Sequence, residues 1–152
     1  MSTKERSTGP GHFRWNKGGW FGSQLGGTAW MLVGSVVLFP PAPEVAGIWI
    51  ACFAVANGIG SWMWRRRERI RPYPALQSLL LACGVSGLTA LVALHVLRPG
   101  LQIARPFGMD LADEPRNLVW LIIVVASLMA WFHFLEWNAK QQSARSNGRA
   151  LR

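Results

Sequence analysis

The chain has 152 residues, of which 51% are apolar, and 16 Lys and Arg against 7 Asp and Glu give a formal net charge of +9. The apolar residues concentrate in four runs close to the ~20 residues that a helix needs to cross a hydrocarbon layer about 30 Å thick. These runs contain no Lys or Arg, whereas a soluble helical bundle needs charged outer faces. Length and composition therefore argue against a soluble protein and indicate one all-α integral membrane domain.

A bundle of four transmembrane helices is predicted, with Glu136 as the one acidic residue inside the spans. A cleaved secretory signal does not fit the first span, because about twenty polar or interfacial residues precede it and two prolines follow it. We expect an N-terminal segment with an interfacial anchor over 1–20, a transmembrane domain over 21–137 and a basic, mobile tail over 138–152. The predicted spans are 21–39, 48–64, 75–97 and 118–137.

The basic residues alternate along the chain as the positive-inside rule describes. The first, third and fifth polar segments hold four, five and four Lys and Arg, whereas the second and fourth hold none and three. This pattern predicts that both termini are cytoplasmic (N-in/C-in) in the inner, or cytoplasmic, membrane of the cell. Thirteen of the 16 basic residues then lie on the cytoplasmic side, which has a charge of +10 against −1 outside.

Aromatic and basic residues are interleaved over His12–Trp20, directly before the first span. In a soluble basic protein this pattern would suggest a surface for stacking nucleic-acid bases. Beside a membrane span, however, Trp rings favour the headgroup level, and Arg and Lys extend toward water and lipid phosphate. We therefore interpret the segment as a membrane anchor and expect no nucleic-acid partner.

The first span opens with small and polar residues, two pairs of which are four residues apart and share a helix face. Small residues at this spacing allow another backbone to approach closely, and polar neighbours can hydrogen-bond across the contact. The pattern fits packing against the protein's own helices, against a partner or second copy, or the lining of an oligomeric pore. The candidate residues are Gly22, Ser23, Gln24, Gly26, Gly27 and Thr28, with Asn57 and Gly58 on the second span.

A dense arginine cluster follows the second span, directly after two tryptophans. Basic residues near a membrane surface each contribute about 1 kcal/mol of attraction to anionic lipid. We therefore expect this cluster to contact anionic lipid headgroups, although such contacts are general among membrane proteins. The cluster consists of Arg65, Arg66, Arg67, Arg69 and Arg71.

His133 is the candidate cofactor ligand, because aromatic residues surround it in the sequence. A single histidine can ligate a haem iron or the magnesium of a bacteriochlorophyll. His95 is not expected to share that metal, since it lies near the outer end of the third span, whereas His133 is about 22 Å below the start of the fourth. Alternatively, His133 and Glu136 are three residues apart and can form a charge-assisted pair on one helix face.

Other chemistry has few residues to support it. Cys52 and Cys83 lie inside spans without a paired-ligand pattern and are expected to pack as small apolar residues. Three outer carboxylates lack the spacing of a metal loop, and no common catalytic motif is present. We expect neither a metal site nor an enzyme, but a small accessory or assembly subunit of a larger membrane complex, such as a respiratory or photosynthetic one. The alternatives are a homo-oligomeric channel or small transporter, and a haem- or bacteriochlorophyll-binding subunit.

Overall fold

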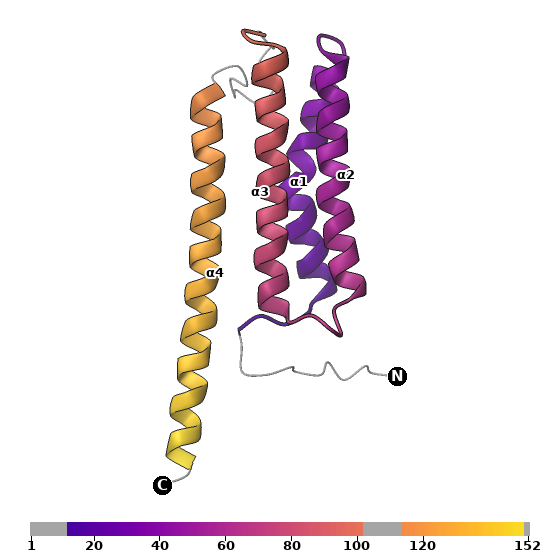
Figure 1. Cartoon of the computed structure of the whole chain (residues 1–152). Helices are drawn as coiled ribbons and strands as arrows, with labels where there is room; N and C mark the ends of the chain where they lie inside the picture. The colour runs from indigo at the N-terminus through magenta and orange to yellow at the C-terminus, as the bar shows by residue number, and fades with distance from the viewer. Residues whose placement is uncertain (1–11, 102–113, 151–152) are drawn as a thin grey trace.

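The computed structural model describes residues 12–101 and 114–150, and four long helices account for nearly all of these residues (Figure 1). Each helix is long and apolar enough to cross a membrane. In the last helix, the segment that meets this criterion is Arg116–Ser146. The prediction of an all-helical chain with four helices of membrane length is confirmed. The helices are α1 (Lys17–Leu38), α2 (Pro43–Arg65), α3 (Pro72–Leu97) and α4 (Glu114–Ala150).

Helices α1, α2 and α3 begin three to five residues before the apolar runs that predicted them. The Asn16 side chain caps α1 by accepting a hydrogen bond from the backbone N–H of Gly19 at 3.0 Å. Pro43 and Pro72 occupy the first turns of α2 and α3. Caps and first-turn prolines start a helix within polar sequence, so hydropathy alone places these starts too late.

Helix α4 continues well beyond the predicted end of the fourth span. Residues 138–150, which we expected to be a mobile tail, extend the helix to Ala150. Once a helix is nucleated, each further residue adds a hydrogen bond at little cost, and the extension is rich in good helix formers such as Ala, Lys, Gln and Arg. The Ser143 hydroxyl also donates to the Ala139 carbonyl, 3.0 Å away. The basic tail therefore begins as a polar continuation of α4.

Helices α1, α2 and α3 pack against one another, and α4 lies along α3 (Figure 1). Glycines permit close approaches between these helices. An ideal Cβ on Gly84 would lie 3.0 Å from the Val125 side chain of α4, and one on Gly87 would lie 3.0 Å from the Trp30 ring of α1. Two clusters of buried apolar residues fill the three-helix unit. One contains Met31, Leu38, Ala42, Val45, Ala46, Trp49, Ala90 and Leu94, and the other Trp20, Met63, Ala75 and Leu79.

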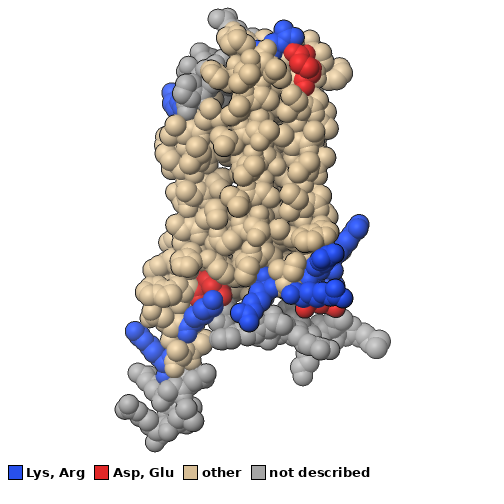
Figure 2. All heavy atoms as spheres, in the orientation of Figure 1, with Lys and Arg blue, Asp and Glu red and all other residues tan. Residues whose placement is uncertain are grey.

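The face of the bundle drawn in Figure 2 carries no charged residue along its middle, and the Lys, Arg, Asp and Glu residues on it gather toward the two ends. None of the most apolar stretch of α4 is buried within the protein. We call the end where α1 begins and α2 ends the basic end, and the other the opposite end. The exposed basic residues at the basic end are Arg14, Lys17, Arg65, Arg66, Arg67, Arg69, Arg71, Lys140 and Arg145.

An ion pair at the opposite end joins α2 to α3. The Nε of Arg98, just past α3, donates to the Glu44 carboxylate in the first turn of α2. This hydrogen bond raises the pKa of the Arg98 guanidinium above its ordinary value. Both side chains are exposed, so the pair adds little to stability.

Candidate functional site

A buried polar cluster joins α1 to α2 near the basic end, and it contains three of the residues singled out in the sequence. Gln24 Nε2 donates to the backbone carbonyl of Asn57 at 2.8 Å and to its Oδ1 at 2.9 Å. Asn57 Nδ2 in turn donates to Thr28 Oγ1 at 3.0 Å, and the Thr28 hydroxyl donates to the Gln24 carbonyl at 2.8 Å. The three side chains therefore hydrogen-bond mainly to one another across the helix pair.

Gln24 fits into this cluster because a glycine lies opposite it. Gln24 is 2% exposed, and an ideal Cβ on Gly60 would lie 2.5 Å from its Oε1. That oxygen is buried and has no hydrogen-bond partner among the described residues. Gly60 therefore makes room for the amide, and a larger residue at this position would displace it.

The small residues of the predicted packing faces differ in whether another helix of the protein lies close to them. Gly22, Ser23, Gly26, Gly27 and Gly58 are all exposed, and a Cβ on Gly22, Gly26 or Gly58 would meet nothing within 4 Å. Gly27 lies beside α3, where its ideal Cβ would be 3.8 Å from the Cys83 sulfur. The glycine pair of α1 with four-residue spacing thus faces away from the protein's own helices.

The aromatic residues that we expected to anchor the chain at the membrane interface pack against the basic end of the bundle. Trp15 packs 4.8 Å from Trp20 and 5.7 Å from Trp64, measured between ring centroids. The Nε1 of Trp15 donates to the Ile70 carbonyl at 3.2 Å, and that of Trp20 donates to the Gly60 carbonyl at 3.1 Å. These rings join the N-terminal segment to α2 and the α2–α3 loop.

All five arginines of the predicted headgroup cluster are exposed at the basic end. The Arg66 guanidinium lies 4.7 Å from the centroid of the Trp62 ring, and the Arg67 guanidinium lies 5.0 Å from that of Trp64. Cation–π contacts of this kind hold a guanidinium beside an aromatic ring. They position two positive charges where the apolar side of the bundle ends.

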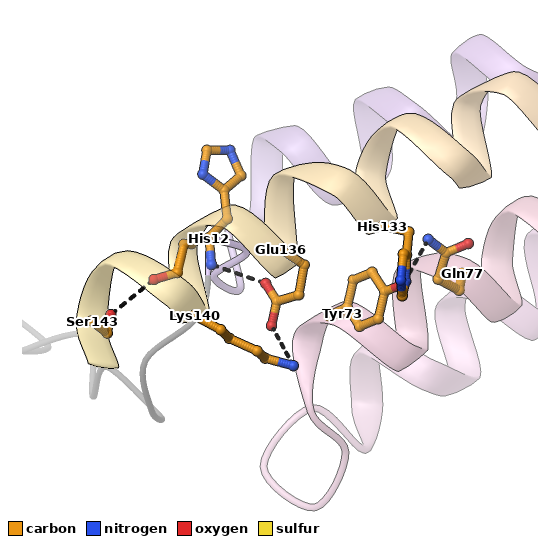
Figure 3. A network of polar contacts seen from close by, with 8 residues as sticks. His12, Tyr73, Gln77, His133, Glu136, Lys140 and Ser143 are labelled. Carbon is orange, nitrogen blue, oxygen red and sulfur yellow. Dashed lines mark hydrogen bonds and ion pairs between the residues drawn. The ribbon is translucent and has the colours of Figure 1, made fainter. Parts of the chain in front are cut away.

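A second polar network joins α3 to α4 near the basic end (Figure 3). The Tyr73 hydroxyl lies 2.7 Å from Nδ1 of His133. Gln77, one turn further along α3, directs Nε2 to the Tyr73 hydroxyl at 3.3 Å and to the Met129 carbonyl at 3.0 Å. His133, the predicted cofactor ligand, is itself exposed. One of its ring nitrogens is therefore committed to a tyrosine of α3.

Glu136 bonds to groups other than His133, although the sequence suggested that the two could pair. Glu136 is 6% exposed, and its carboxylate accepts the backbone N–H of His12 at 2.9 Å and lies 3.3 Å from Nζ of Lys140. Phe13, next to His12, packs against Phe132 of α4, with a centroid distance of 5.4 Å. A buried carboxylate needs such partners, and here they attach the N-terminal segment to α4.

His95 is far from His133, as expected. It lies in the last turn of α3, 22 residues beyond Tyr73, which corresponds to about 33 Å along a helix. Among the described residues, no three His, Cys, Asp or Glu side chains are grouped in a way that could hold a metal ion. Cys52 and Cys83 are free thiols in partly buried positions.

Sequence reasoning missed the residues of α3 that meet His133. Tyr73 and Gln77 are polar and four residues apart, and both lie in the first turns of α3. Their shared face was a usable signal only if the helix was expected to begin before residue 75. The role of His12 had no such signal, because it contributes a backbone N–H that any residue could supply.

Comparison of the chain with protein-family models, with curated proteins and with solved structures finds no match.

Proposed function

We propose that the protein is a non-catalytic subunit of a larger assembly in the inner membrane, with four spans and both termini in the cytoplasm. Four apolar helices with apolar outer faces support the membrane location. The exposed basic residues at one end of the bundle support the orientation, because basic flanks favour the cytoplasmic side. The same end is suited to attract anionic lipid, with Arg66 and Arg67 held beside the rings of Trp62 and Trp64.

The observation that carries the proposal is the outward direction of Gly22 and Gly26. Both are exposed on α1, and neither has a neighbour within 4 Å of the position of a Cβ. Inside a membrane, helix association depends on close van der Waals contact, and small residues four apart provide it. The partner that fits this face is an apolar transmembrane helix of another subunit. The open position of Gly58 on α2 offers a second close approach.

The channel alternative has less support. The side-chain donors of its proposed lining residues form hydrogen bonds within the same chain. These residues are Gln24, Thr28 and Asn57. A pore built by several copies would need these groups to face a shared aqueous path instead. Hydrogen-bonded helix pairing explains the same residues without such a rearrangement.

The proposed docking face, formed by Gly22 and Gly26, is tested by introducing larger side chains at these two positions. Gly22→Leu combined with Gly26→Leu places two large side chains on the face, whereas Val33→Leu combined with Val36→Leu enlarges exposed, already branched positions of the same helix. Native gels of membranes solubilised in mild detergent, with the composition of each band determined by mass spectrometry, give the size of the assembly. We expect the wild type and the valine control to migrate in an assembly larger than the 16.9 kDa chain, with fixed partners.

The glycine variant is expected to leave that assembly and to migrate alone. A wild-type chain that migrates alone would contradict the proposal, as would a glycine variant whose assembly is unchanged. A symmetric oligomer of this chain alone that conducts ions in liposomes would favour the channel.

A further inference from the structure

The hydrogen bonds at the α3–α4 junction have a defined direction. Gln77 Nε2 can only donate, and it points both of its hydrogens at oxygens, those of Tyr73 and Met129. The Tyr73 oxygen is thus already an acceptor, and its own O–H remains to be used. Nδ1 of His133 lies 2.7 Å from the Tyr73 hydroxyl. The series of hydrogen bonds in which every group has a partner therefore runs from Gln77 through the Tyr73 hydroxyl to Nδ1.

This direction selects one tautomer of the His133 ring. If Nδ1 accepts a hydrogen bond from the Tyr73 O–H, a neutral imidazole carries its own hydrogen on Nε2. The reverse arrangement, with Nδ1–H donating to the tyrosine oxygen, leaves the Tyr73 O–H without an acceptor in this network. Leaving a donor unpaired outside water costs about 1–3 kcal/mol. His133, which is an exposed residue, therefore carries an Nε2–H donor that is not used by this network.

The surroundings of His133 indicate which acceptor this donor meets. Trp131, Phe134 and Trp137 of α4 are each about half exposed, and Trp and basic residues mark the boundary of a bilayer. Trp137 is one turn away and Lys140 seven residues away, about 6 Å and 10 Å along the helix. A side chain at that depth is level with the ester and phosphate groups of lipids, whose oxygens accept hydrogen bonds but carry no proton to donate.

We propose that His133 is a lipid-binding residue that donates a hydrogen bond from Nε2 to an ester carbonyl or phosphate oxygen of a phospholipid, with Tyr73 and Gln77 as the positioning residues. This inference rests on the membrane location in the proposed function, but not on docking to a partner. It also bears on the cofactor alternative. A metal needs a bare ring nitrogen, and in this tautomer neither nitrogen of His133 offers one, because Nδ1 is bonded to Tyr73.

Solid-state NMR of the full chain labelled with ¹⁵N-histidine tests the proposal. The protein is reconstituted in phosphatidylcholine and phosphatidylglycerol bilayers whose ester carbonyls carry ¹³C. His133→Gln assigns the signals of His133 by their loss. We expect a protonated Nε2 and a bare Nδ1, with the Nε2 signal dephased by lipid ³¹P or by ester ¹³C. The nucleus that dephases it distinguishes a phosphate from a carbonyl acceptor.

Tyr73→Phe removes the hydroxyl that fixes the tautomer while keeping the aromatic ring. We expect its His133 signals to divide between the two tautomers and the dephasing by lipid to fall. A bare Nε2 in the wild type would overturn the proposal, as would a protonated Nε2 that no lipid nucleus dephases. Protease protection of the spans in the same liposomes separates these outcomes from a failure of membrane insertion.

Discussion

The indole ring of Trp49 occupies the space directly over the backbone of Gly34. An ideal Cβ on Gly34 would lie 2.2 Å from a ring carbon of Trp49, closer than any real contact. Trp49 is fully buried, and its Nε1 donates to the Ala90 carbonyl of α3 at 2.7 Å. One side chain of α2 therefore holds all three helices of the central unit together, and a single hydrogen at position 34 makes this possible.

Gly34→Ala is expected to destabilise the protein, because the rigid, hydrogen-bonded indole has to move away from the added methyl group. Overpacking of this kind costs about 1–3 kcal/mol, measurable by reversible unfolding in mixed micelles of dodecyl sulfate and mild detergent. Gly47→Ala is the matched control, since Gly47 is exposed in α2 with nothing within 4 Å. If both variants unfold at the same detergent fraction, the packing of Trp49 on Gly34 does not hold the helices.

The buried cluster of Gln24, Thr28 and Asn57 is expected to stabilise the α1–α2 pair. Asn57→Ala removes the Oδ1 acceptor of Gln24 and the donor to Thr28, whereas the bond from Gln24 to the backbone carbonyl of residue 57 can remain. A loss of about 1–2 kcal/mol is expected for such interhelical bonds, whereas Ser23→Ala, at an exposed position, should change little. In a double-mutant cycle, Gln24→Ala and Asn57→Ala should be non-additive. Strict additivity would show that the two side chains act independently.

Glu136 is expected to hold the N-terminal segment on α4. Glu136→Ala removes the acceptor of the His12 N–H, so amide exchange at residues 12–16 should become faster in hydrogen–deuterium exchange of the reconstituted protein. Glu68→Ala serves as the control, because Glu68 is exposed in the α2–α3 loop. Unchanged exchange in the Glu136 variant would mean that the aromatic contacts of Phe13 and Trp15 alone fix the segment.

Hydropathy was sufficient to predict the number of helices and their approximate places, because membrane-length apolar runs have few alternative structures. The starts at Lys17 and Pro43 depend on caps and prolines instead. The extension of α4 to Ala150 depends on helix propagation in polar sequence. Neither helix capping nor helix propagation is visible in the hydropathy from which the spans were predicted.

The sites were less predictable, because they depend on which face of each helix meets its neighbour. Gln24 and Gly26 are two residues apart, yet the first is buried against α2 and the second is exposed. The sequence named both residues but left open whether their contacts were internal or external. The bond between Tyr73 and His133 joins residues 60 positions apart, and periodicity within one helix carries no information about such a pair.

The central claim, a four-span protein with its basic end in the cytoplasm, is tested most directly by cysteine labelling in intact cells. Single cysteines at Pro41, Glu68 or Gln141 occupy exposed positions in a background with Cys52→Ala and Cys83→Ala. With a membrane-impermeant maleimide, we expect labelling of the Pro41→Cys variant from outside and of the other two only after lysis. Labelling of Glu68→Cys or Gln141→Cys in intact cells, with Pro41→Cys protected, would contradict the orientation. Labelling of all three from one side would contradict the four spans.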